Sequence, residues 1–410
     1  MAEKIETIVV GGGQAGLAMS QSLSRLGREH VVLERSRVAE RWRSERWDSL
    51  AFQFPSWSLT LPGYPYRTND PDGFAHRDHV VQFLEEYAVH IRAPLRLGVT
   101  ATALRQKSDN SYRFALQTDR GDWEARNVVL ATGPFQRPSI PACSAALPGV
   151  ITQIHSRDYR NPRQLPPGPV LVIGGGTSGA EIAQELHEAG REVYLSIGGY
   201  RKGLRRYRGR DFLWWVNELK LWDRPVDLNP EARKERVPLL TGRDGGSGID
   251  LRCFTGEGAH LLGRMQGMCD GRIRLAPDLK ETLDAGDAWS DRFRQMMDDY
   301  VEYTGLDLPE ETAFAVAPNG RYPAITELDL AAAGIVAVVW ATGYRYDLGW
   351  VECPAFADTG DPVQRRGVTD VPGLYFLGLR RMCTVKSALL SAEGVGADAE
   401  YLAGRITGTC

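Results

Sequence analysis

Apolar runs and amphipathic segments follow one another along this chain in an order that occurs twice. In the first set, residues 4–10 and 30–33 are short apolar runs typical of buried strands, and residues 14–27 carry apolar positions at helical spacing. The second set has the same order and occupies residues 170–173, 177–190 and 192–196. Because apolar strands that alternate with helices form parallel sheets covered by helices, we predict an α/β fold with two such units.

Both units pass from the first strand into the helix through three glycines. They are Gly11, Gly13 and Gly16 in the first unit and Gly174, Gly176 and Gly179 in the second. The first glycine permits a tight turn, the second lets the backbone approach a pyrophosphate, and the third lets the helix pack closely on the strand. Neighbouring helix residues join this candidate set, namely Gln14, Ala15, Thr177 and Ser178. Two such turns predict two dinucleotides facing each other, as in a flavoprotein that a nicotinamide cofactor reduces.

The two units differ where their second strands end. Glu34 lies 18 residues after the third glycine, where a carboxylate binds both hydroxyls of an unphosphorylated ribose, and Arg35 follows it. We therefore assign the first unit to FAD. The second unit ends at Ser196 without an acid and is followed by Arg201 and Lys202, which favours a ribose with a 2′-phosphate and hence NADPH. The alternative is a solvated basic loop, in which case NADH is possible.

These assignments predict two Rossmann-like dinucleotide-binding domains, of which the FAD domain is discontinuous. We expect residues 1–165 to form its first part, residues 166–334 to form the NAD(P)H domain, and residues 335–410 to complete the FAD domain. Residues 203–310 exceed what a minimal Rossmann unit needs and predict an extra, mostly helical insert with a helix at residues 278–303. Part of this insert would cover the substrate entrance; the alternative is a subdomain that only packs.

Other segments predict further elements. Two apolar strands that end in Ala-Thr-Gly flank the second unit, and we interpret them as the two crossovers between the domains. Residues 97–125 predict a small antiparallel meander, and residues 78–90 a helix with Asp78 as its N-cap. A helix at residues 386–402 would point its N-terminus at the pyrimidine end of the flavin.

Composition narrows the range of partners. The formal net charge is −3 and 43% of the residues are hydrophobic, so we expect a soluble globular protein with no nucleic-acid partner. No apolar run approaches the roughly 18 residues that span a bilayer, and the first strand leaves no room for a signal peptide, so we expect a cytoplasmic protein without membrane insertion. The six cysteines include no Cys-x-x-Cys pair and no metal-ligand spacing with the seven histidines. We therefore expect neither a redox dithiol nor a metal site.

Taken together, the motifs resemble those of class B flavin-dependent monooxygenases, the group of the flavin-containing monooxygenases and the YUCCA-type enzymes. Within that group the chain is most similar to the bacterial branch described as flavoproteins involved in potassium transport. The resemblance spans nearly the whole chain and rests on residues 11–16, 34, 42–43, 47–50, 61–63, 131–133, 174–179, 341–343 and 373–379.

The resemblance implies that FAD stacks against residues 42–50 and that the second Ala-Thr-Gly turn is the family's linker motif, with Trp340 where Phe is usual. The cofactor-contacting residues that it implies are Trp42, Arg43, Trp47, Asp48, Ala101, Ala131, Thr132, Gly133, Ala341, Thr342, Gly343, Gly378, Leu379, Leu389 and Leu390. The chain departs from the family pattern in two places. Ala39 and Glu40 stand where paired glycines usually precede the flavin-contacting Trp, and Gly198 stands where an Arg often follows the serine of the second unit.

The resemblance also implies the reaction. NADPH reduces FAD, the reduced flavin takes up O2 at C4a as a hydroperoxide, and one oxygen atom passes to a nucleophilic nitrogen or sulfur of a small organic substrate. Gln53 is the candidate catalytic residue, as a hydrogen-bond partner of that peroxide; the alternative is an ordinary loop glutamine. The motif at residues 155–159 ends in Tyr159 instead of Trp, which favours heteroatom oxygenation over Baeyer-Villiger oxygenation of a ketone. An NAD(P)H oxidase or electron-transfer flavoprotein, a non-catalytic nucleotide sensor and a homodimer stay open.

Overall fold

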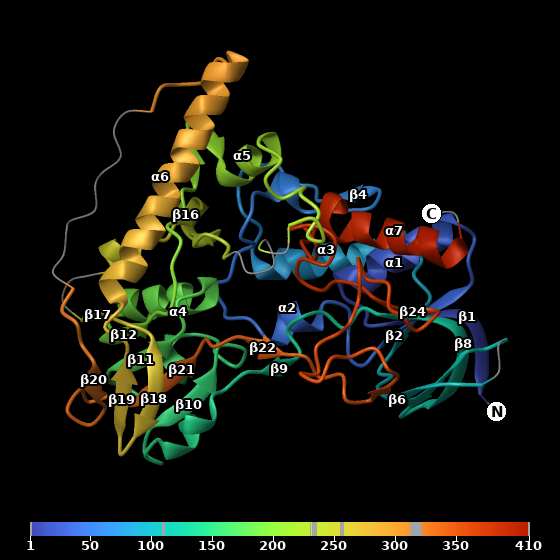
Figure 1. The fold of residues 1–410 in the computed structure, drawn as a ribbon, viewed down its shortest axis with the longest axis horizontal. Coiled ribbons are helices and arrows are strands. Elements are labelled where there is room, and N and C mark those ends of the chain that lie inside the picture. The colour runs from blue at the N-terminus through green and yellow to red at the C-terminus, as the bar shows by residue number, and fades with distance from the viewer. Residues whose placement is uncertain are drawn as a thin grey trace.

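The chain folds around two sheets that lie side by side (Figure 1). The computed structural model describes residues 2–108, 111–229, 231, 236–254, 258–311 and 322–408. Cys410 and the parts of the predicted insert at residues 230, 232–235 and 255–257 lie outside the described residues. Each sheet carries one of the predicted strand-helix-strand units, which confirms the α/β fold with two Rossmann-like units.

The first sheet has eight strands and contains the first glycine turn. Its order is β23-β6-β7-β8-β1-β2-β5, and β24 also pairs with β8. β1 lies between β2 and β8 and runs parallel to both, as its buried apolar residues lead one to expect. The strands are β1 (Glu3–Val10), β2 (His30–Glu34), β5 (Leu95–Leu97), β6 (Ala101–Gln106), β7 (Phe114–Thr118), β8 (Gly121–Leu130), β23 (Val351–Glu352) and β24 (Leu374–Phe376). The predicted meander is confirmed in β6, β7 and β8, although β8 runs on without a break up to the first Ala-Thr-Gly turn.

The second sheet has five parallel strands in the order β10-β21-β11-β12-β17. The strands are β10 (Thr152–His155), β11 (Val170–Ile173), β12 (Val193–Ser196), β17 (Ala259–Leu262) and β21 (Ala337–Trp340). β10 and β21 belong to this sheet, although the predicted boundaries after residues 165 and 334 leave both strands outside the NAD(P)H domain. Their pairing favours boundaries that lie outside these two strands, and the division into domains stays a prediction.

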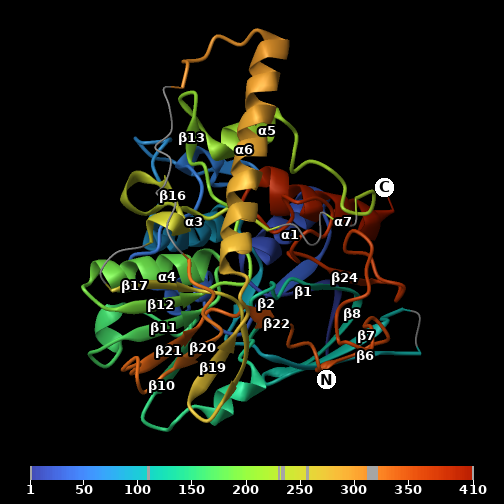
Figure 2. The ribbon, with the colours of Figure 1, turned by 60° about the vertical axis from the view of Figure 1, so that its left-hand side comes forward.

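Helices cover both sheets. α1 (Gln14–Arg25) contacts β1, β2, α3 (Arg77–His90) and α7 (Ala397–Thr407), while α4 (Thr177–Glu188) contacts β11 and β12. Figure 2 shows α4 on the second sheet and α1 and α7 together on the first. The remaining short elements outside the insert are α2 (Glu40–Ser44), β3 (Thr60–Leu61), β4 (Tyr64–Pro65), β9 (Arg137–Pro138) and β22 (Tyr344–Arg345).

The predicted N-cap of α3 is wrong by two residues. Nδ1 of His76 accepts a hydrogen bond from the backbone N–H of Asp78 at 3.3 Å, so His76 is the N-cap and the helix begins at Arg77. Asp78 instead places a carboxylate in the first helical turn, where it interacts favourably with the helix dipole.

The C-terminal helix also begins later than residue 386, where it was predicted to start. A π-helical turn at Ala392–Gly396 leads into α7, and the hydroxyl of Ser391 caps it by accepting from the N–H of Gly394 at 2.9 Å. The preceding residues form a loop instead, because they pair with the insert: the N–H of Val226 donates to the carbonyl oxygen of Cys383 at 2.9 Å. The two segments are far apart in the sequence, so the helical spacing of apolar residues could not predict this contact.

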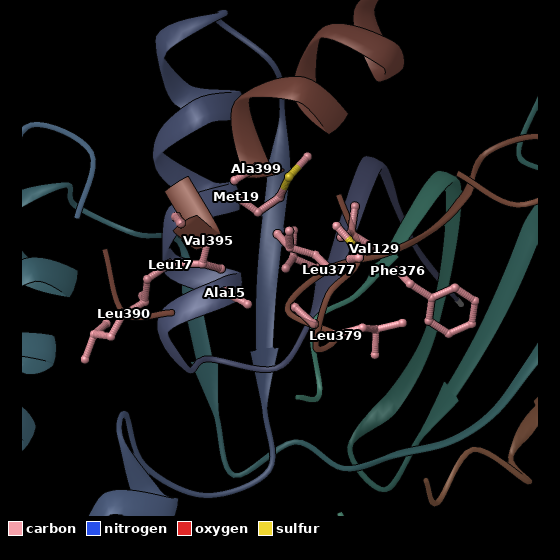
Figure 3. Packing of buried hydrophobic residues seen from close by; sticks show 14 of the residues in the cluster. Ala15, Leu17, Met19, Val129, Phe376, Leu377, Leu379, Leu390, Val395 and Ala399 are labelled. Carbon is pink, nitrogen blue, oxygen red and sulfur yellow. The ribbon is translucent and has the colours of Figure 1, made fainter. Parts of the chain in front are cut away.

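Apolar side chains from distant segments meet in the core of the first half (Figure 3). Leu17 and Met19 of α1 are fully buried and lie among Leu377, Val395 and Ala399 of the C-terminal segment. Burying one side chain of this size stabilises the fold by about 1.5–3 kcal/mol. Packing on α1 therefore fixes the C-terminal segment beside the first glycine turn.

The predicted insert at residues 203–310 contains α5 (Phe212–Glu218) and α6 (Leu279–Thr304), and α6 confirms the helix predicted at residues 278–303. The described part of the insert is not mostly helical, because it also contains β17 of the second sheet and several short strands. The far end of α6 stands away from both sheets (Figure 1). Phe212 and Phe293 lie in the same buried cluster as β1, so the insert packs on the first half of the molecule. Its short strands are β13 (Arg206–Tyr207), β14 (Arg210–Asp211), β15 (Leu240–Thr241), β16 (Ser247–Gly248), β18 (Met265–Cys269) and β19 (Arg272–Leu275), and β20 (Glu327–Asp329) pairs with β19.

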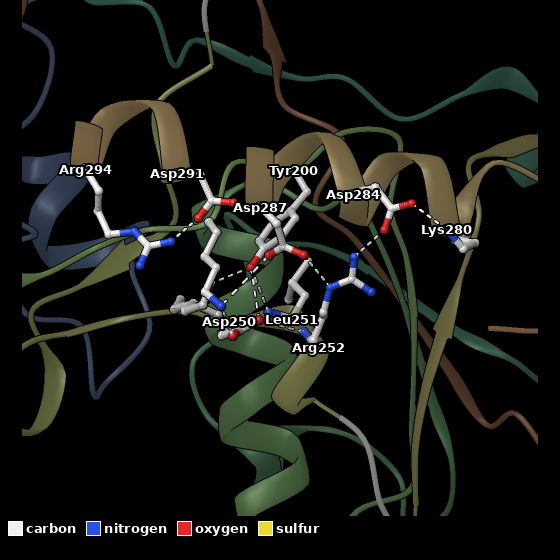
Figure 4. Close-up of polar contacts among 11 residues, drawn as sticks. Tyr200, Asp250, Leu251, Arg252, Lys280, Asp284, Asp287, Asp291 and Arg294 are labelled. Carbon is white, nitrogen blue, oxygen red and sulfur yellow. Dashed lines mark hydrogen bonds and ion pairs between the residues drawn. The ribbon is translucent and has the colours of Figure 1, made fainter. Parts of the chain in front are cut away.

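A charged network fixes α6 to the loops beside it (Figure 4). Arg252 donates to Asp284 and Asp287 of α6, each at 2.5 Å. The hydroxyl of Tyr200 donates to Asp250 at 3.2 Å. Burial and the charge of Asp250 raise the pKa of Tyr200, so its hydroxyl stays protonated and continues to donate.

Candidate cofactor and active site

The first glycine turn leaves room for a phosphate. A Cβ atom on Gly16 would lie 1.8 Å from the carbonyl oxygen of Gly11, and one on Gly11 would lie 2.5 Å from that of Ala131. A Cβ atom on Gly13 would instead meet no described atom within 4 Å. Gly13 is the N-cap of α1, and no side chain caps this helix. The N–H groups of the first turn of α1 therefore lie beside open space, which suits a pyrophosphate.

The second glycine turn reproduces this arrangement. A Cβ atom on Gly179 would lie 1.8 Å from the carbonyl oxygen of Gly174, and one on Gly174 would lie 2.3 Å from that of Ala341. Gly176, the uncapped N-terminus of α4, again faces open space. Gly174 has a φ of +125°, in the range that favours glycine. The three roles predicted for the glycines thus fit both turns.

Each Ala-Thr-Gly turn lies directly beside one glycine turn. The N–H of Ala131 donates to the carbonyl oxygen of Val10, and the N–H of Ala341 donates to that of Ile173, both at 2.8 Å. Thr132 and Gly133 follow beside the first turn, and Thr342 and Gly343 beside the second. The two strands that end in these turns belong to different sheets, so the two halves are built on the same plan.

The chain segments that leave these turns pair with each other. β9 and β22 are antiparallel, and the N–H of Ser139 donates to the carbonyl oxygen of Gly343 at 2.9 Å. His155 donates from Nε2 to the same oxygen at 3.0 Å, because its Nδ1 accepts from the N–H of Arg157. Burial lowers the pKa of His155, which keeps the ring neutral and this tautomer in place. The predicted crossovers are therefore the two paired segments beyond the strands.

Glu34 lies at the end of β2 with its carboxylate beside the first turn. Oε2 accepts from the N–H of Gly12 at 2.7 Å, and Oε1 accepts from the N–H of Ser36 at 2.9 Å. Each oxygen retains a lone pair for a ribose hydroxyl. The N–H of Val99 donates to the backbone oxygen of Glu34, which brings the start of β6 with Ala101 toward the same end of the sheet. The neighbouring Arg35 is exposed.

Each of the residues predicted to recognise the second ribose has a partner within the protein. Ser196 is buried and donates from Oγ to the carbonyl oxygen of Gly263 at 2.8 Å. The Lys202 ammonium lies 2.5 Å from Asp250, so it belongs to the network around α6. Arg201 donates to the carbonyl oxygen of Arg236 at 2.7 Å. The structure thus gives Lys202 a carboxylate partner.

The segment at residues 42–50 connects the two halves. Trp42 is half-buried against Phe52, whose ring centroid lies 6.4 Å from its own. Trp47 instead packs in the buried cluster of the second half. Asp48 accepts from Arg77 at 2.9 Å and from Asn161 at 2.7 Å. Trp42 therefore lies with the first half, while Trp47 and Asp48 join the halves.

A second candidate residue of this segment, Arg43, forms an ion pair with Glu85 of α3. It also donates to the carbonyl oxygen of Val38 at 3.4 Å. These contacts hold α2 against α3, and they give Arg43 a structural task beside the cofactor role that the resemblance implies.

Gln53 is half-buried, and its side-chain nitrogen Nε2 is a buried donor. Its Nε2 has no hydrogen-bond partner among the described residues. Its backbone oxygen accepts from Nη1 of Arg205 at 2.8 Å, and Nε of Arg205 lies 3.0 Å from Asp211. Burial raises the pKa of Asp211, and the guanidinium beside it acts in the opposite sense. An unpaired buried amide is costly unless a ligand accepts from it, so Gln53 fits a site that binds one.

The loop before α7 closes the site from the C-terminal side. Nε2 of Gln14 donates to the carbonyl oxygen of Ala388 at 2.7 Å, and Ala388 has a φ of +67°. A Cβ atom on Gly378 would lie 2.7 Å from Cβ of Ala15. Leu379 and Leu390 are buried, and Leu389 is half-buried. This loop and the first glycine turn therefore lie together, as predicted for FAD.

Sequence reasoning missed two acids of α4. Ser49 and Tyr159 each donate to Glu185 at 2.6 Å, which ties α4 to the segment at residues 42–50. Glu181 is buried one turn earlier, and burial raises its pKa to about 8, while a hydrogen bond with Thr241 acts in the opposite sense. No pattern in the sequence distinguishes these residues from ordinary polar positions of an amphipathic helix.

The described residues were also compared with the requirements of a metal site and of a membrane-spanning helix. They contain no group of three or more His, Cys, Asp or Glu side chains able to hold a metal ion. No helix among them combines the length and apolar character needed to cross a membrane.

Two uncapped helix N-termini beside open glycines, each preceded by a parallel strand, define a flavoprotein with two dinucleotide-binding units. The chain belongs to the pyridine nucleotide-disulphide oxidoreductase family, which matches residues 8–216. It is 33% identical over 403 residues to the uncharacterized oxidoreductase CzcO-like of Geobacillus kaustophilus, covering 97% of both chains. It is 27% identical to indole-3-pyruvate monooxygenase YUCCA1 of Oryza sativa, covering 90% of this chain and 86% of that protein.

The fold is similar to a solved structure of the flavin-containing monooxygenase from Stenotrophomonas maltophilia. The TM-score is 0.65 at 19% identity, with 100% of this chain and 99% of that chain covered. The relatives confirm the predicted resemblance to flavin-dependent monooxygenases of the flavin-containing and YUCCA type, and the chain is an oxidoreductase of that type. FAD and NADPH, the predicted cofactors, are the cofactors of this type of enzyme.

Proposed function

We propose that the protein is an NAD(P)H- and O2-dependent flavoprotein monooxygenase that oxygenates a nucleophilic nitrogen or sulfur of a small organic substrate. The observation that carries this proposal is the repeated glycine turn, which supplies two phosphate-binding helix N-termini in one chain. The similarity to YUCCA1 supports oxygen transfer as the reaction class. The cytoplasmic location belongs to the proposal as well, and so does the division into an FAD domain in two parts with an NAD(P)H domain between them, whose boundaries lie outside β10 and β21.

The residues of the first half fit FAD. Gly13 and the N–H groups of α1 would hold its pyrophosphate, and Glu34 its adenosine ribose. Trp42 and the loop around Ala388 would lie against the flavin. When bound, FAD supplies the redox chemistry that takes up hydride and activates dioxygen.

The protein's own contribution to the reaction is to orient groups and exclude water. Nε2 of Gln53 would donate a hydrogen bond to a group bound in the site, and Arg205 holds the backbone of Gln53 in place. Phe54 and Trp222 are buried with their ring centroids 5.8 Å apart, so the insert covers this segment with an apolar contact. A dry site limits the loss of the activated oxygen to water.

The test uses purified protein with FAD, NADPH and a panel of tertiary amines, thioethers and ketones under ¹⁸O2. The proposal predicts a labelled N-oxide or sulfoxide and hydrogen peroxide in less than stoichiometric yield. Gln53→Leu should reduce the flavin at the wild-type rate but convert more oxygen to peroxide, because only the orienting hydrogen bond is lost. Stoichiometric peroxide with every substrate would show an oxidase, a labelled ester from a ketone would show Baeyer-Villiger chemistry, and flavin that neither nicotinamide reduces would show a non-catalytic protein.

A further inference from the structure

The two halves offer matching positions for the adenosine ribose. In the first half β1 and β2 pair Val10 with Leu33, and in the second half β11 and β12 pair Ile173 with Ser196. The next residues, Glu34 and Ile197, are therefore equivalent. A Cβ atom built on Gly12 would lie 2.8 Å from Cβ of Glu34, and one built on Gly175 would lie 2.8 Å from Cβ of Ile197.

This equivalence changes the chemistry of the second site. The side chain of Ile197 is buried and offers no acceptor to a ribose hydroxyl. It also carries no negative charge that would repel a phosphate on that ribose. The choice between a phosphorylated and an unphosphorylated ribose therefore depends on the residues that follow Ile197.

Two guanidinium groups converge on the next peptide group. Nη2 of Arg264 donates to the carbonyl oxygen of Gly198 at 2.6 Å, and Nη2 of Arg236 donates to the same oxygen at 3.3 Å. Arg264 follows β17, and Arg236 lies in the loop before β15, so neither belongs to the strand-helix-strand unit itself. The arginine that the family carries after the serine is absent here, and two arginines from other segments lie at its place.

Glycines make this approach possible. A Cβ atom on Gly198 would lie 3.0 Å from Nε of Arg264, and one on Gly199 would lie 2.3 Å from Cζ of Arg236. Any side chain at these two positions would displace the guanidinium groups. Gly198 and Gly199 therefore leave the space that the two guanidinium groups occupy.

The charges at this place are not balanced within the described part of the chain. The guanidinium of Arg264 lies 3.8 Å from the carboxylate of Asp278, which already accepts from the backbone N–H of Arg264 at 3.0 Å, and the Arg264 side chain is 59% exposed. No ion pair joins Arg236 to a described residue. Lys202, in contrast, lies 2.5 Å from Asp250 and 3.9 Å from Asp287. Two neighbouring guanidinium groups repel each other, and a dianion between them would remove that cost.

Space for such a dianion lies alongside. Gly199 and Arg236 line an open hollow of about 430 Å³ with the start of α6 opposite. The other lining residues are Tyr200, Arg201, Glu281, Thr282, Ala285, Trp289 and Arg292. Three arginines face a single carboxylate, Glu281, so the hollow is positively charged overall.

We propose that Arg236 and Arg264 bind the ribose 2′-phosphate of the nicotinamide cofactor and set its preference for the phosphorylated form, and that Lys202 does not. The ligand chemistry is a phosphate monoester with a charge near −2, bound by charge-assisted and bidentate hydrogen bonds. This inference rests on the proposed function only in taking a nicotinamide nucleotide as the ligand of the second site.

The test measures binding without turnover. Isothermal titration of the FAD-loaded protein with adenosine 2′,5′-bisphosphate and with AMP reports the contribution of the 2′-phosphate directly. We expect Arg236→Gln and Arg264→Gln each to weaken the bisphosphate by roughly tenfold or more and to leave AMP unchanged, since one charge-assisted contact is lost. Gly199→Ala should weaken the bisphosphate in the same direction without removing a charge. Arg272→Gln, an exposed arginine paired with Glu327, is the matched control and should bind both ligands as wild type does.

Each outcome decides the question. Equal binding of the two ligands by the wild type, or loss of selectivity in Lys202→Gln but not in the arginine variants, overturns the proposal. Selective loss in the arginine variants supports it. Because no oxygen is transferred, the result stands apart from the monooxygenase test: a protein that selects the bisphosphate through these arginines and yet makes only peroxide would lose the proposed function and keep this inference.

Discussion

Replacing Arg205 separates the two tasks that its guanidinium performs, holding Gln53 and neutralising Asp211. The Arg205 side chain is 5% exposed and that of Asp211 10% exposed, with Nε and Oδ2 3.0 Å apart. Arg205→Met removes the cation and leaves the carboxylate buried. Removing one partner of a buried ion pair costs about 3–5 kcal/mol, because the remaining charge stays desolvated.

For a chain of this size, such a cost lowers the melting temperature by roughly 4–6 °C. Thermal unfolding of the FAD-loaded protein measures it, with Arg272→Met as the control. Arg272 is 54% exposed, and the loss of a surface pair of this kind costs less than about 1 kcal/mol.

The double variant Arg205→Met with Asp211→Leu completes the experiment. An apolar pair in place of a buried ion pair is often close to neutral in stability, so the melting temperature should recover in large part. The remaining deficit is about 1 kcal/mol, because Asp211 also caps α5 by accepting from the N–H of Leu213 at 2.8 Å. The hydrogen bond to the backbone of Gln53 is still missing, so the yield of peroxide per NADPH should stay raised. If Arg205→Met is no less stable than Arg272→Met, the pair is not buried as described and the reasoning fails. If the double variant restores tight coupling, Arg205 does not position Gln53.

Three further predictions follow from the site. Gly13→Ala should leave the melting temperature of the apoprotein unchanged, because its Cβ meets open space, and should lower the retention of FAD. Gly16→Ala should destabilise even the apoprotein, because its Cβ clashes with Gly11. Equal stability of the two apoproteins would contradict this prediction. Glu34→Gln should weaken FAD binding by roughly tenfold on loss of a charged acceptor, measured by flavin release, and unchanged retention would remove Glu34 from the site. Burial raises the pKa of Glu181 from 4.5 to about 8, so the stability that protonated Glu181 contributes falls as the pH rises between these values. The melting temperature of Glu181→Gln should therefore rise relative to that of the wild type from pH 5 to pH 8 and level off above. A difference that does not depend on pH would refute the raised pKa.

The strand-helix-strand units could be predicted from the sequence because their physics is local. Apolar runs, helical spacing and the three glycines all lie within about thirty residues, and each glycine has a steric reason that the turn itself imposes. Gly16 and Gly179 show this most directly, since each lies against the backbone of its own turn. The meander and α6 could be predicted for the same reason.

Contacts between distant segments could not be predicted. Arg236 and Arg264 reach Gly198 from loops that carry no motif, while the nearer Lys202 is drawn to Asp250. The start of the C-terminal helix was wrong because Cys383, Thr384 and Lys386 contact the insert, and no periodicity encodes those contacts. The position of Trp47 in the second half depends likewise on how the two sheets meet.

β9 and β22, the two passages of chain between the halves, form one hydrogen-bonded ribbon. A rotation that keeps its bonds has to bend both passages together, since neither can slide past the other without losing its register. Any relative motion of the halves that keeps this ribbon intact would therefore bend both passages at the same place. Since each Ala-Thr-Gly turn leads into the ribbon, such a motion would act on both glycine turns at once.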